Sequence, residues 1–344
     1  MKKRFAIYPH LPVGQAGGGN PYINDFVAAI QALPGCKVVN CPHKNPLLSL
    51  LHPKSWADVY VFNWYESIPD YKYGYLQALI ALCLVGWVRI CGKRVVWVLH
   101  NKQPHSGGRM WVKRLMAAFM ARQAHLILTH AEEGVELVAA RHPRAVHKVK
   151  MFHHPTKNRL DEVDRTAIAK EYDLLVWGAI TPYKGVLELA HYLQANESHG
   201  LRVCVAGHCA DESLKQALRR FELPGLKWEL RRLSFEELAV KIGQSNYVLT
   251  PYQPETVLSS GILMDSLSFG AKVIGPRTGA FRDCSTDERL NVYTFDTLDE
   301  LASLVEVHRG EDVDLEAYAD FLKENSWVHF TSRLLQALHL STTA

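Results

Sequence analysis

The sequence predicts an α/β protein made of two doubly wound domains. Short apolar runs rich in β-branched residues alternate with segments of helical period along the whole 344-residue chain. The apolar runs are continuous rather than alternating, as in parallel strands that are covered on both faces. A chain of this length can form two domains of ordinary size, each with its own core. We therefore expect two parallel sheets, each flanked by helices, that face each other across a cleft.

The first domain is expected over residues 1–160. Its strands are predicted from six apolar runs, RFAIYP, KVVNC, ADVYVFNW, RVVWVLHN, HLILTH and HKVKMFHH. Helical periodicity between these runs predicts helices that begin near Asn20, Pro46, Tyr71, Arg109 and Glu132. Each strand is thus separated from the next by room for a crossover, which a parallel sheet requires.

The second domain is expected over residues 171–325. Its strands are predicted from the runs YDLLVWGAI, LRVCVAG, KWELRRL, NYVLTPY, KVIGP and NVYTF, with helices near Gly185, Asp211, Ser234, Ser259 and Thr297. The charged stretch 156–171 separates the domains, and residues 326–344 are expected to form a helix that crosses toward the first domain. Ligands of doubly wound sheets bind outside the carboxyl ends of the strands, so the residues that follow each strand are the candidate site.

Charge is distributed unevenly along the chain. Residues 1–165 carry a net charge of +12 and the remainder −8, although the whole chain carries only +4. A basic first half indicates an anionic partner, either nucleic acid or an acidic membrane surface, unless it is simply a solvated basic face.

Composition also bears on location and metal content. The basic start MKKR leads directly into FAIYPH, too short for the apolar core of a signal peptide, so we expect a cytoplasmic protein. Seven cysteines without a CxxC pair indicate reduced thiols. The 17 histidines show no zinc-ligand spacing, and no metal is expected.

The first strand of the second half leads into the segment TPYKGVLEL. Pro182 and Gly185 predict a tight turn, and Lys184 then lies beside the free N–H groups at the positive end of the next helix. This arrangement favours a phosphate, although a surface lysine in a turn would have the same sequence.

The strand NYVLTPY leads into a second anion-binding pattern. Ser259 or Ser260 is suited to cap a helix whose first turn contains Gly261, which lets an anion approach the backbone closely. Asp265 follows one turn later and Glu255 lies in the loop before the cap, where carboxylates commonly bind ribose hydroxyls. The simpler alternative is an ordinary capped helix with solvated acids.

Strand ends of the first half supply a further set of polar residues. Gly18 and Gly19 belong to a glycine loop after the first strand, whose spacing differs from a dinucleotide fingerprint. Glu66 follows the third strand, and His100 and Asn101 follow the fourth. Because these strands are parallel, the side chains are expected at one edge of the sheet.

With these residues placed, the chain resembles GT-B glycosyltransferases, particularly the bacterial enzymes related to glycosyltransferase family 4 that build exopolysaccharide or lipopolysaccharide. The resemblance covers nearly the full length and rests on NPYINDFVAAI, DVYVFNWYES, WVLHNKQPH, GAITPYKGVLEL and SSGILMDSLSFGAKVIGPRTGAF. It implies two Rossmann-like domains, the first for the acceptor and the second for a UDP- or GDP-linked sugar. It also implies that neither a cofactor nor a metal is needed.

The resemblance further implies roles for individual residues. Lys184 would contact the nucleotide diphosphate, and the helix that begins at Ser259, Ser260 and Gly261 would hold the phosphates or the sugar. Asp265 would hold the ribose.

The chain departs from the family pattern at two places. Retaining members carry two glutamates eight positions apart; here Asp265 takes the second place and Val257 the first, with Glu255 out of register. An arginine often found shortly before the lysine is missing, and Arg202 and Arg277 are the candidates to replace it. Retention and inversion of configuration are therefore both left open.

Sugar transfer requires positive charge at the leaving nucleotide, here from Lys184 and a helix N-terminus. If the enzyme inverts configuration, a base must deprotonate the acceptor hydroxyl, and Glu66 is the first candidate, followed by His10 and His100. If it retains configuration, His100 would face the donor sugar and orient it.

The acceptor is expected to be a lipid-linked saccharide or an oligosaccharide. Residues 107–123 mix large apolar side chains with basic ones that include Arg109, Lys113 and Arg114, a pattern typical of a helix that lies on an anionic membrane. Residues 75–90 are too short to span a bilayer but apolar enough to dip into one. These features predict peripheral attachment to the inner face of the plasma membrane, unless the apolar helix is simply buried.

Three other functions share these features. A GT-B sugar-nucleotide epimerase would consume a nucleotide sugar without an acceptor, and a non-catalytic sensor would bind it without turnover. A nucleic-acid-binding protein would use the basic half, but the sequence has no aromatic-rich RNA-reading motif, so no nucleic-acid partner is expected.

Overall fold

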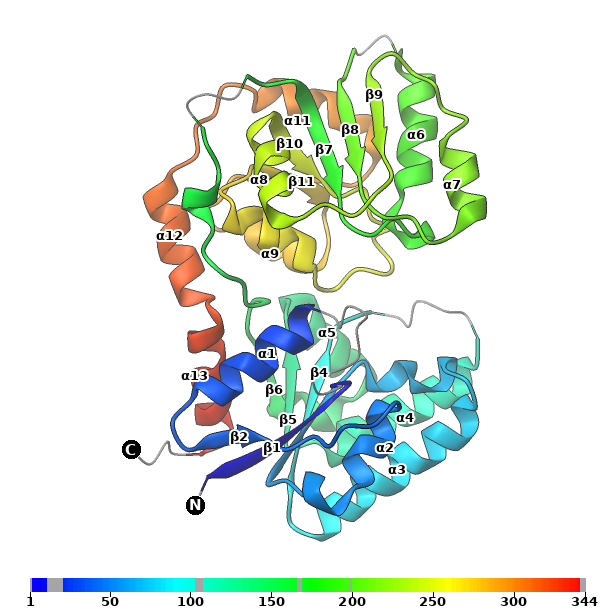
Figure 1. Ribbon diagram of the computed structural model, residues 1–344, viewed down its shortest axis with the longest axis vertical. Coiled ribbons are helices and arrows are strands. Elements are labelled where there is room, and N and C mark those ends of the chain that lie inside the picture. The colour runs from blue at the N-terminus through cyan, green and yellow to red at the C-terminus, as the bar shows by residue number, and fades with distance from the viewer. Residues whose placement is uncertain (1, 11–20, 103–107, 166–168, 198–199, 341–344) are drawn as a thin grey trace. The chain divides into compact units, whose positions relative to one another are not determined.

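The computed structural model describes residues 2–10, 21–102, 108–165, 169–197 and 200–340. The chain forms two compact units: the first unit comprises Met1–Pro155 and Trp327–Ala344, and the second comprises Thr156–Ser326. Each unit is a parallel six-stranded sheet with helices on both faces (Figure 1). None of the helices in the described ranges has the length and apolar character needed to cross a membrane.

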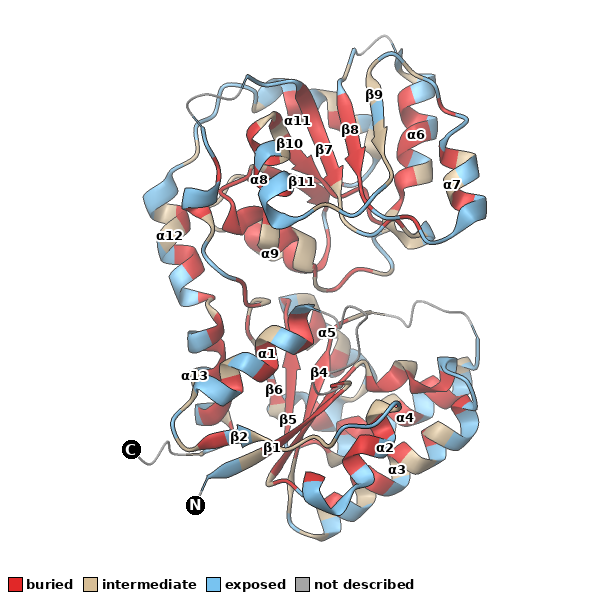
Figure 2. Ribbon diagram, in the orientation of Figure 1, coloured by how far each residue is buried: buried red, intermediate tan, exposed pale blue. Residues whose placement is uncertain are grey.

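The sheet of the first unit has the strand order β2-β1-β3-β4-β5-β6. Its strands are β1 (Lys3–Tyr8), β2 (Cys36–Val38), β3 (Val59–Asn63), β4 (Arg94–Leu99), β5 (Leu126–Thr129) and β6 (Val149–Met151). The strands β3 and β4 are buried along nearly their whole length, which explains their continuous runs of β-branched and aromatic residues (Figure 2). The order changes direction between β1 and β3, and ligands of doubly wound sheets bind at such a switch point.

Two groups of helices cover the first sheet. One face carries α1 (Pro21–Ala32) and α13 (Trp327–Ala337), which pack against each other and share a core. Right-handed crossovers place the remaining helices on the opposite face. These are α2 (Pro46–Leu51), α3 (Gly74–Ile90), α4 (Met110–Gln123) and α5 (Glu132–Arg141). The end of the chain therefore packs into the first unit through α13.

The sheet of the second unit has the strand order β12-β11-β10-β7-β8-β9. Its strands are β7 (Tyr172–Trp177), β8 (Val203–Ala206), β9 (Leu226–Glu229), β10 (Ser245–Leu249), β11 (Val273–Pro276) and β12 (Val292–Phe295). Its helices are α6 (Val186–Ala195), α7 (Glu212–Leu218), α8 (Phe235–Gly243), α9 (Gly261–Ser268), α10 (Gly279–Cys284), α11 (Leu301–Val307) and α12 (Leu315–Glu324). Here the order changes direction between β7 and β10, which defines the switch point of this sheet.

The structure confirms the predicted α/β architecture of two doubly wound sheets, and every predicted strand is found. Helix starts follow their capping signals: α8 begins with a capping box of Ser234 and Glu237, and Asn45 caps α2 ahead of Pro46. The sequence did not predict α10, which is only six residues long, or α12, which is capped by Asp314.

Candidate functional site

The carboxyl edge of the second sheet brings together the two strand ends that the sequence singled out. The strands β7 and β10 are hydrogen-bonded neighbours at the switch point. A short 3-10 helix, η5 (Pro182–Lys184), and α6 follow β7, whereas α9 follows β10. Ligands bind where such crossovers diverge, so Lys184 and the first turn of α9 flank the candidate site of this unit.

Two glycines allow the backbone segments of this site to approach closely. Gly178, at the end of β7, has a φ of +99°, and a Cβ there would lie 2.6 Å from Ile262 Cδ1 and 3.6 Å from Lys184 Nζ. Gly185 has a φ of +67°, and a Cβ there would lie 1.8 Å from the carbonyl oxygen of Pro251. Side chains at either position would be strained and would clash. The Lys184 amine and the Ile262 side chain in the first turn of α9 therefore both lie close to Gly178.

Lys184 carries a positive charge that no side chain in the described ranges neutralises. Its side chain is half-buried, and Nζ lies 5.6 Å from the centroid of the Tyr252 ring. No carboxylate in the described ranges lies within ion-pairing distance of it. Burial lowers the pKa of Lys184 to about 8, because the charged form loses hydration without gaining an anionic partner. A bound anion would supply that partner.

The first turn of α9 offers backbone donors beside this lysine. Ser260 caps the helix, and its side-chain oxygen accepts a hydrogen bond from the Leu263 N–H at 3.1 Å. Ser259 precedes the cap and is half-buried, so the helix proper begins at Gly261. The N–H groups of Gly261 and Ile262 have no hydrogen-bond acceptor in the described part of the chain. They are therefore available to an anion at the positive end of the helix.

The acidic candidates differ in their surroundings. Asp265 lies on α9, one turn after Gly261, and its Oδ1 accepts a hydrogen bond from Thr156 Oγ1 at 2.9 Å. Glu255 is exposed in the loop between β10 and α9, whereas Val257 is buried. The buried valine stands where the retaining pattern has its first glutamate. The assignments of Asp265 and Glu255 to ribose or sugar stay predictions.

Neither of the two candidate arginines, Arg202 and Arg277, adds a free positive charge to the site beside Lys184 in the described structure. Arg202 precedes β8 and pairs with Asp173 at 3.1 Å, which puts it at the amino edge of the sheet, opposite Lys184. Its suggested role as a replacement for the missing arginine is therefore wrong. Arg277 does follow β11 at the carboxyl edge, but its Nε lies 3.1 Å from Asp296 Oδ2, so an acid already neutralises it.

The first unit places His10 at its own switch point, immediately after β1. The side chain is 9% exposed, and its Nδ1 has no hydrogen-bond partner within the described ranges. Burial lowers the pKa of His10, so the neutral ring persists to lower pH. The glycine-loop candidates Gly18 and Gly19 lie outside the described residues.

His100 follows β4, but other aromatic rings enclose it. Its ring stacks on Trp64 with centroids 4.3 Å apart, and Tyr22 meets it edge-on at 4.9 Å. Its Nε2 lies 3.0 Å from Asn63 Oδ1. Burial holds the pKa of His100 well below its usual value. Its contacts are those of a packed, neutral ring, and a role at the donor sugar stays a prediction.

Two further histidines beside His100, the buried His130 and the half-buried His154, predict acid sensitivity of the first unit. Burial lowers the pKa of His130 to about 3 and that of His154 to about 4, against about 6.5 in an unfolded chain. The unfolded state therefore binds more protons below pH 6.5, and stability is lost as the pH falls. We expect His130→Gln, which cannot titrate, to lose less unfolding free energy than the wild type between pH 6.5 and 4.5, by about 2 kcal/mol. Chemical denaturation at both pH values measures this; equal losses would show that His130 is not responsible.

Glu66 lies at the same edge as His100 but on the opposite face of the sheet. It belongs to a 3-10 helix, η2 (Tyr65–Asp70), and lines a cavity of about 550 Å³ between α4 and α5. The side chain is 5% exposed; Trp97 Nε1 donates to Oε2 at 3.4 Å, and Oε1 has no partner among the described residues. Burial raises the pKa of Glu66 to about 7, although Trp97 and Lys113 oppose the rise. A carboxyl group with this pKa is suited to exchange protons near neutral pH.

The structure corrects one basic residue of the predicted membrane helix. Lys113 is only 1% exposed, and its Nζ lies 2.7 Å from Asp70 Oδ1. The side chain of Arg109 contacts the carbonyl oxygen of Pro69 and lies over the Tyr75 ring at 4.6 Å. Of the basic residues named for membrane contact, Lys113 is thus buried, whereas Arg109 and Arg114 are exposed.

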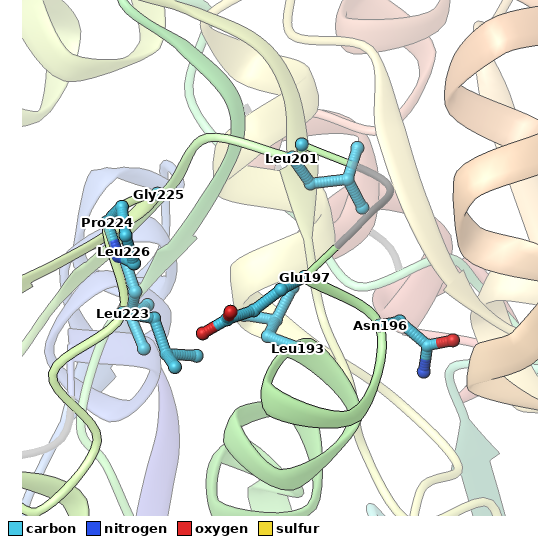
Figure 3. A pocket seen from close by; sticks show the side chains of 9 residues that line it. Leu193, Asn196, Glu197, Leu201, Leu223, Pro224, Gly225 and Leu226 are labelled. Carbon is cyan, nitrogen blue, oxygen red and sulfur yellow. The ribbon is translucent and has the colours of Figure 1, made fainter.

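A second cavity, of about 330 Å³, lies at the other edge of the second sheet (Figure 3). The described residues of its lining are mainly apolar, with Glu197 as the one ionisable side chain among them, and the amide of Asn196 points away from the other side chains. Converging polar groups mark ligand sites, so this cavity is not the candidate site. The described ranges also contain no group of three His, Cys, Asp or Glu side chains that could hold a metal ion.

Sequence reasoning missed several residues at these sites. Tyr252 packs under Lys184, and Trp177 Nε1 donates to Ser266 Oγ at 2.9 Å, which ties β7 to α9. Arg141 lines the cavity beside Glu66. Tyr252 could have been found from the sequence, because it directly follows a strand end. Arg141 could not, because a basic residue at a helix C-terminus usually reflects only the helix dipole.

Comparison of the sequence finds no matching protein-family model and no curated protein that matches it. Solved structures do match. HepE from Anabaena, in complex with UDP, aligns with a TM-score of 0.69 at 14% identity, covering 98% of this chain and all of that one.

Two further solved structures align over nearly the whole chain. The lipopolysaccharide outer core galactosyltransferase WaaB matches with a TM-score of 0.62 at 14% identity, covering 98% of this chain and 99% of its own. AviGT4, a glycosyltransferase involved in avilamycin A biosynthesis, matches with a TM-score of 0.60 at 15% identity, covering 98% and 97%. At these identities the likeness concerns the fold. The chain has the two-domain GT-B fold that these glycosyltransferases share.

Proposed function

We propose that this protein is a glycosyltransferase that uses a nucleotide-diphosphate sugar. The observation that carries the proposal is the unneutralised Lys184 beside the free N–H groups of Gly261 and Ile262, at the switch point of the second sheet. Such a site suits a diphosphate, since cation and backbone donors converge on it. Structures of HepE bound to UDP and to UDP-glucose, on the same fold, support this choice of ligand and a hexosyl donor.

The reaction we propose is a single displacement. The acceptor oxygen bonds to the anomeric carbon while the bond from that carbon to the nucleotide diphosphate breaks, and the electron pair leaves with the diphosphate. Lys184 and the N-terminus of α9 stabilise that growing negative charge in place of a metal ion. A single displacement inverts the configuration of the anomeric carbon, and such a reaction needs a base; the carboxylate of Glu66 takes the proton of the acceptor hydroxyl.

We also propose that the acceptor is lipid-linked and that the first unit attaches to an anionic membrane. Large apolar side chains of α3 and α4 are exposed, and we call this set the apolar face: Tyr75, Leu76, Leu79, Trp87, Ile90, Trp111 and Leu115. Neither helix contains an acidic residue, and exposed basic residues such as Lys72 and Arg114 border the face. Apolar insertion and attraction to anionic lipid act together in such surfaces. A role in surface polysaccharide synthesis at the cytoplasmic side fits this surface and the likeness to WaaB.

Vesicle binding tests the apolar face. We expect the double variant Trp87→Ser and Trp111→Ser to bind vesicles containing anionic lipid at least about tenfold more weakly than the wild type, because it loses the two largest inserting side chains. Val328→Ser is the control, since Val328 is equally exposed but lies on α13, which covers the other face of the sheet. Co-sedimentation measures binding. Equal binding of the double variant, or none by the wild type, would rule out this attachment.

The transfer proposal is tested by following the fate of the donor. The protein is incubated with UDP- and GDP-sugars, with and without membrane lipid extract, and release of nucleotide diphosphate is measured together with the sugar product. We expect acceptor-dependent release and an altered lipid product. Epimerised donor without an acceptor would identify an epimerase, and binding without release would identify a sensor; either result would overturn the proposal.

A further inference from the structure

The first unit contains a binding site that the donor site does not explain. This is the cavity of about 550 Å³ between α4 and α5, within the volume range of small-ligand pockets. Residues from the ends of β3 and β4 form one side, and α4 and the end of α5 form the other. The residues that matter below are Glu66, Asn101, Arg114 and Arg141.

Two residues that line this cavity each have a buried polar atom without a hydrogen-bond partner among the described residues. Glu66 Oε1 and Asn101 Nδ2 are both shielded from solvent, and neither makes a hydrogen bond within the described residues. Buried polar groups in folded proteins are almost always satisfied, so an unsatisfied pair at one cavity points to a missing ligand. A carboxylate oxygen accepts and an amide nitrogen donates. Hydroxyl groups, such as those of a sugar, can pair with either kind of atom, because they donate and accept.

Two arginines give the cavity an anion-binding wall. Arg114 projects from α4 and Arg141 from the end of α5, and neither pairs with a carboxylate in the described part of the chain. Arg141 Nη1 donates to the carbonyl oxygen of Lys102 at 2.9 Å. This bond positions the guanidinium and leaves its other N–H groups available to a ligand. The two lining lysines are already paired, with Glu133 at 2.5 Å and Asp70 at 2.7 Å. Unpaired guanidinium groups are the preferred partners of phosphate.

Apolar surface adjoins these arginines. Met110, Ala117, Leu137 and Val138 supply the apolar part of the lining. The helix that carries Arg114 also carries Trp111 and Leu115 of the apolar face. A ligand with a phosphate in the cavity and a hydrocarbon chain along α4 would therefore meet matching chemistry at both ends.

We propose that this cavity binds the phosphorylated head of an amphiphilic acceptor, a saccharide joined through phosphate to a hydrocarbon chain. Arg114 and Arg141 hold the phosphate, and Glu66 and Asn101 hydrogen-bond to the hydroxyl group that receives the sugar. The assignment rests on the proposed function, because it makes this hydroxyl the acceptor of the transfer reaction.

Calorimetric titration of the full chain with three probes tests this site. The probes are n-decyl phosphate below its critical micelle concentration, inorganic pyrophosphate and n-decyl glucoside. The first carries both the phosphate and the hydrocarbon chain, the second carries phosphate alone, and the third carries the chain without phosphate. The variants are the pair Arg114→Glu with Arg141→Glu, and the control Arg122→Glu, an exposed arginine of α4 that does not line the cavity. All substituted side chains are exposed, so folding should persist, and circular dichroism checks it.

We expect n-decyl phosphate to bind the wild type and the control alike, and the double variant at least about tenfold more weakly. Pyrophosphate and n-decyl glucoside should both bind more weakly than n-decyl phosphate at this site. If pyrophosphate binds as tightly as n-decyl phosphate, the cavity is a site for free phosphate, and the proposal of an amphiphilic ligand is wrong. If the double variant binds n-decyl phosphate as the wild type does, or if the control loses binding equally, the ligand does not bind in this cavity and the proposal is wrong. UDP, GDP and CDP titrated into the same samples separate the two ideas: binding of any one of them leaves the proposed function standing, whereas binding of none by the wild type refutes that function.

Discussion

Replacing Lys184 with glutamine is expected to lower kcat/KM for the nucleotide sugar by about 100- to 1,000-fold, because the leaving diphosphate loses a side-chain cation at the switch point. Glutamine keeps much of the length of the side chain and removes only the charge. Arg277→Gln is the matched control, since it removes a cation from the same edge of the sheet that Asp296 already neutralises. Initial rates of nucleotide diphosphate release measure both.

The pKa of Lys184 adds a pH signature to this prediction. In the protein without ligand, the pKa of Lys184 is about 8. A bound diphosphate raises this pKa because it favours the charged form. Affinity should therefore be constant below pH 8 and fall as the pH rises above it, by up to about tenfold per pH unit. The Lys184→Gln protein should lack this dependence. The same loss of affinity in both proteins would assign it to another group.

Replacing Glu66 with glutamine is expected to lower kcat by about 100- to 10,000-fold, the range that a general base contributes. Wild-type kcat/KM should fall on the acid side with an apparent pKa of about 7, because the base works only when deprotonated. The groups that act on this carboxyl are Trp97 and Lys113, with Lys102, Arg114, Arg141 and His142 across the cavity.

Retained UDP binding is the control for Glu66→Gln, because the donor site belongs to the other unit. His10→Asn is the competing variant, since His10 is also buried and has an unpartnered ring nitrogen in the described structure. Full turnover of Glu66→Gln with loss in His10→Asn would transfer the role of base to the histidine.

The fold was predictable because its signals are local. Continuous apolar runs mark buried parallel strands, and the caps of α2, α8 and α9 lie within three residues of their helix starts. The position of Lys184 beside α9 was predictable for the same reason, since both follow strands that meet at the switch point. The exact cap, Ser260 rather than Ser259, depends on backbone geometry that two adjacent serines do not reveal.

The surroundings of Glu66 and His100 could not be predicted from strand order alone. Side chains along β4 alternate between faces, and His100 points to the face of α1. Glu66 follows Trp64, which has a left-handed backbone with a φ of 49°, and this break in alternation turns the glutamate to the opposite face. No propensity rule places a tryptophan in that conformation.

Burial of charged residues was the other failure of sequence reasoning. Lys113 fits the pattern of a membrane-facing helix, yet it is buried because Asp70, more than forty positions earlier, lies within 2.7 Å. Arg141 and Asn101 meet at one cavity only because α5 packs beside the end of β4. Such contacts arise from tertiary packing, which the local sequence does not encode.

Calorimetric titration of the wild-type protein with UDP, GDP and CDP tests most directly whether the second unit binds a nucleotide diphosphate at Lys184. We predict saturable binding of at least one of the three, weakened at least about tenfold by Lys184→Gln and unchanged by Arg277→Gln. Binding of none of them, or equal affinity in the Lys184→Gln protein, would contradict the proposed site.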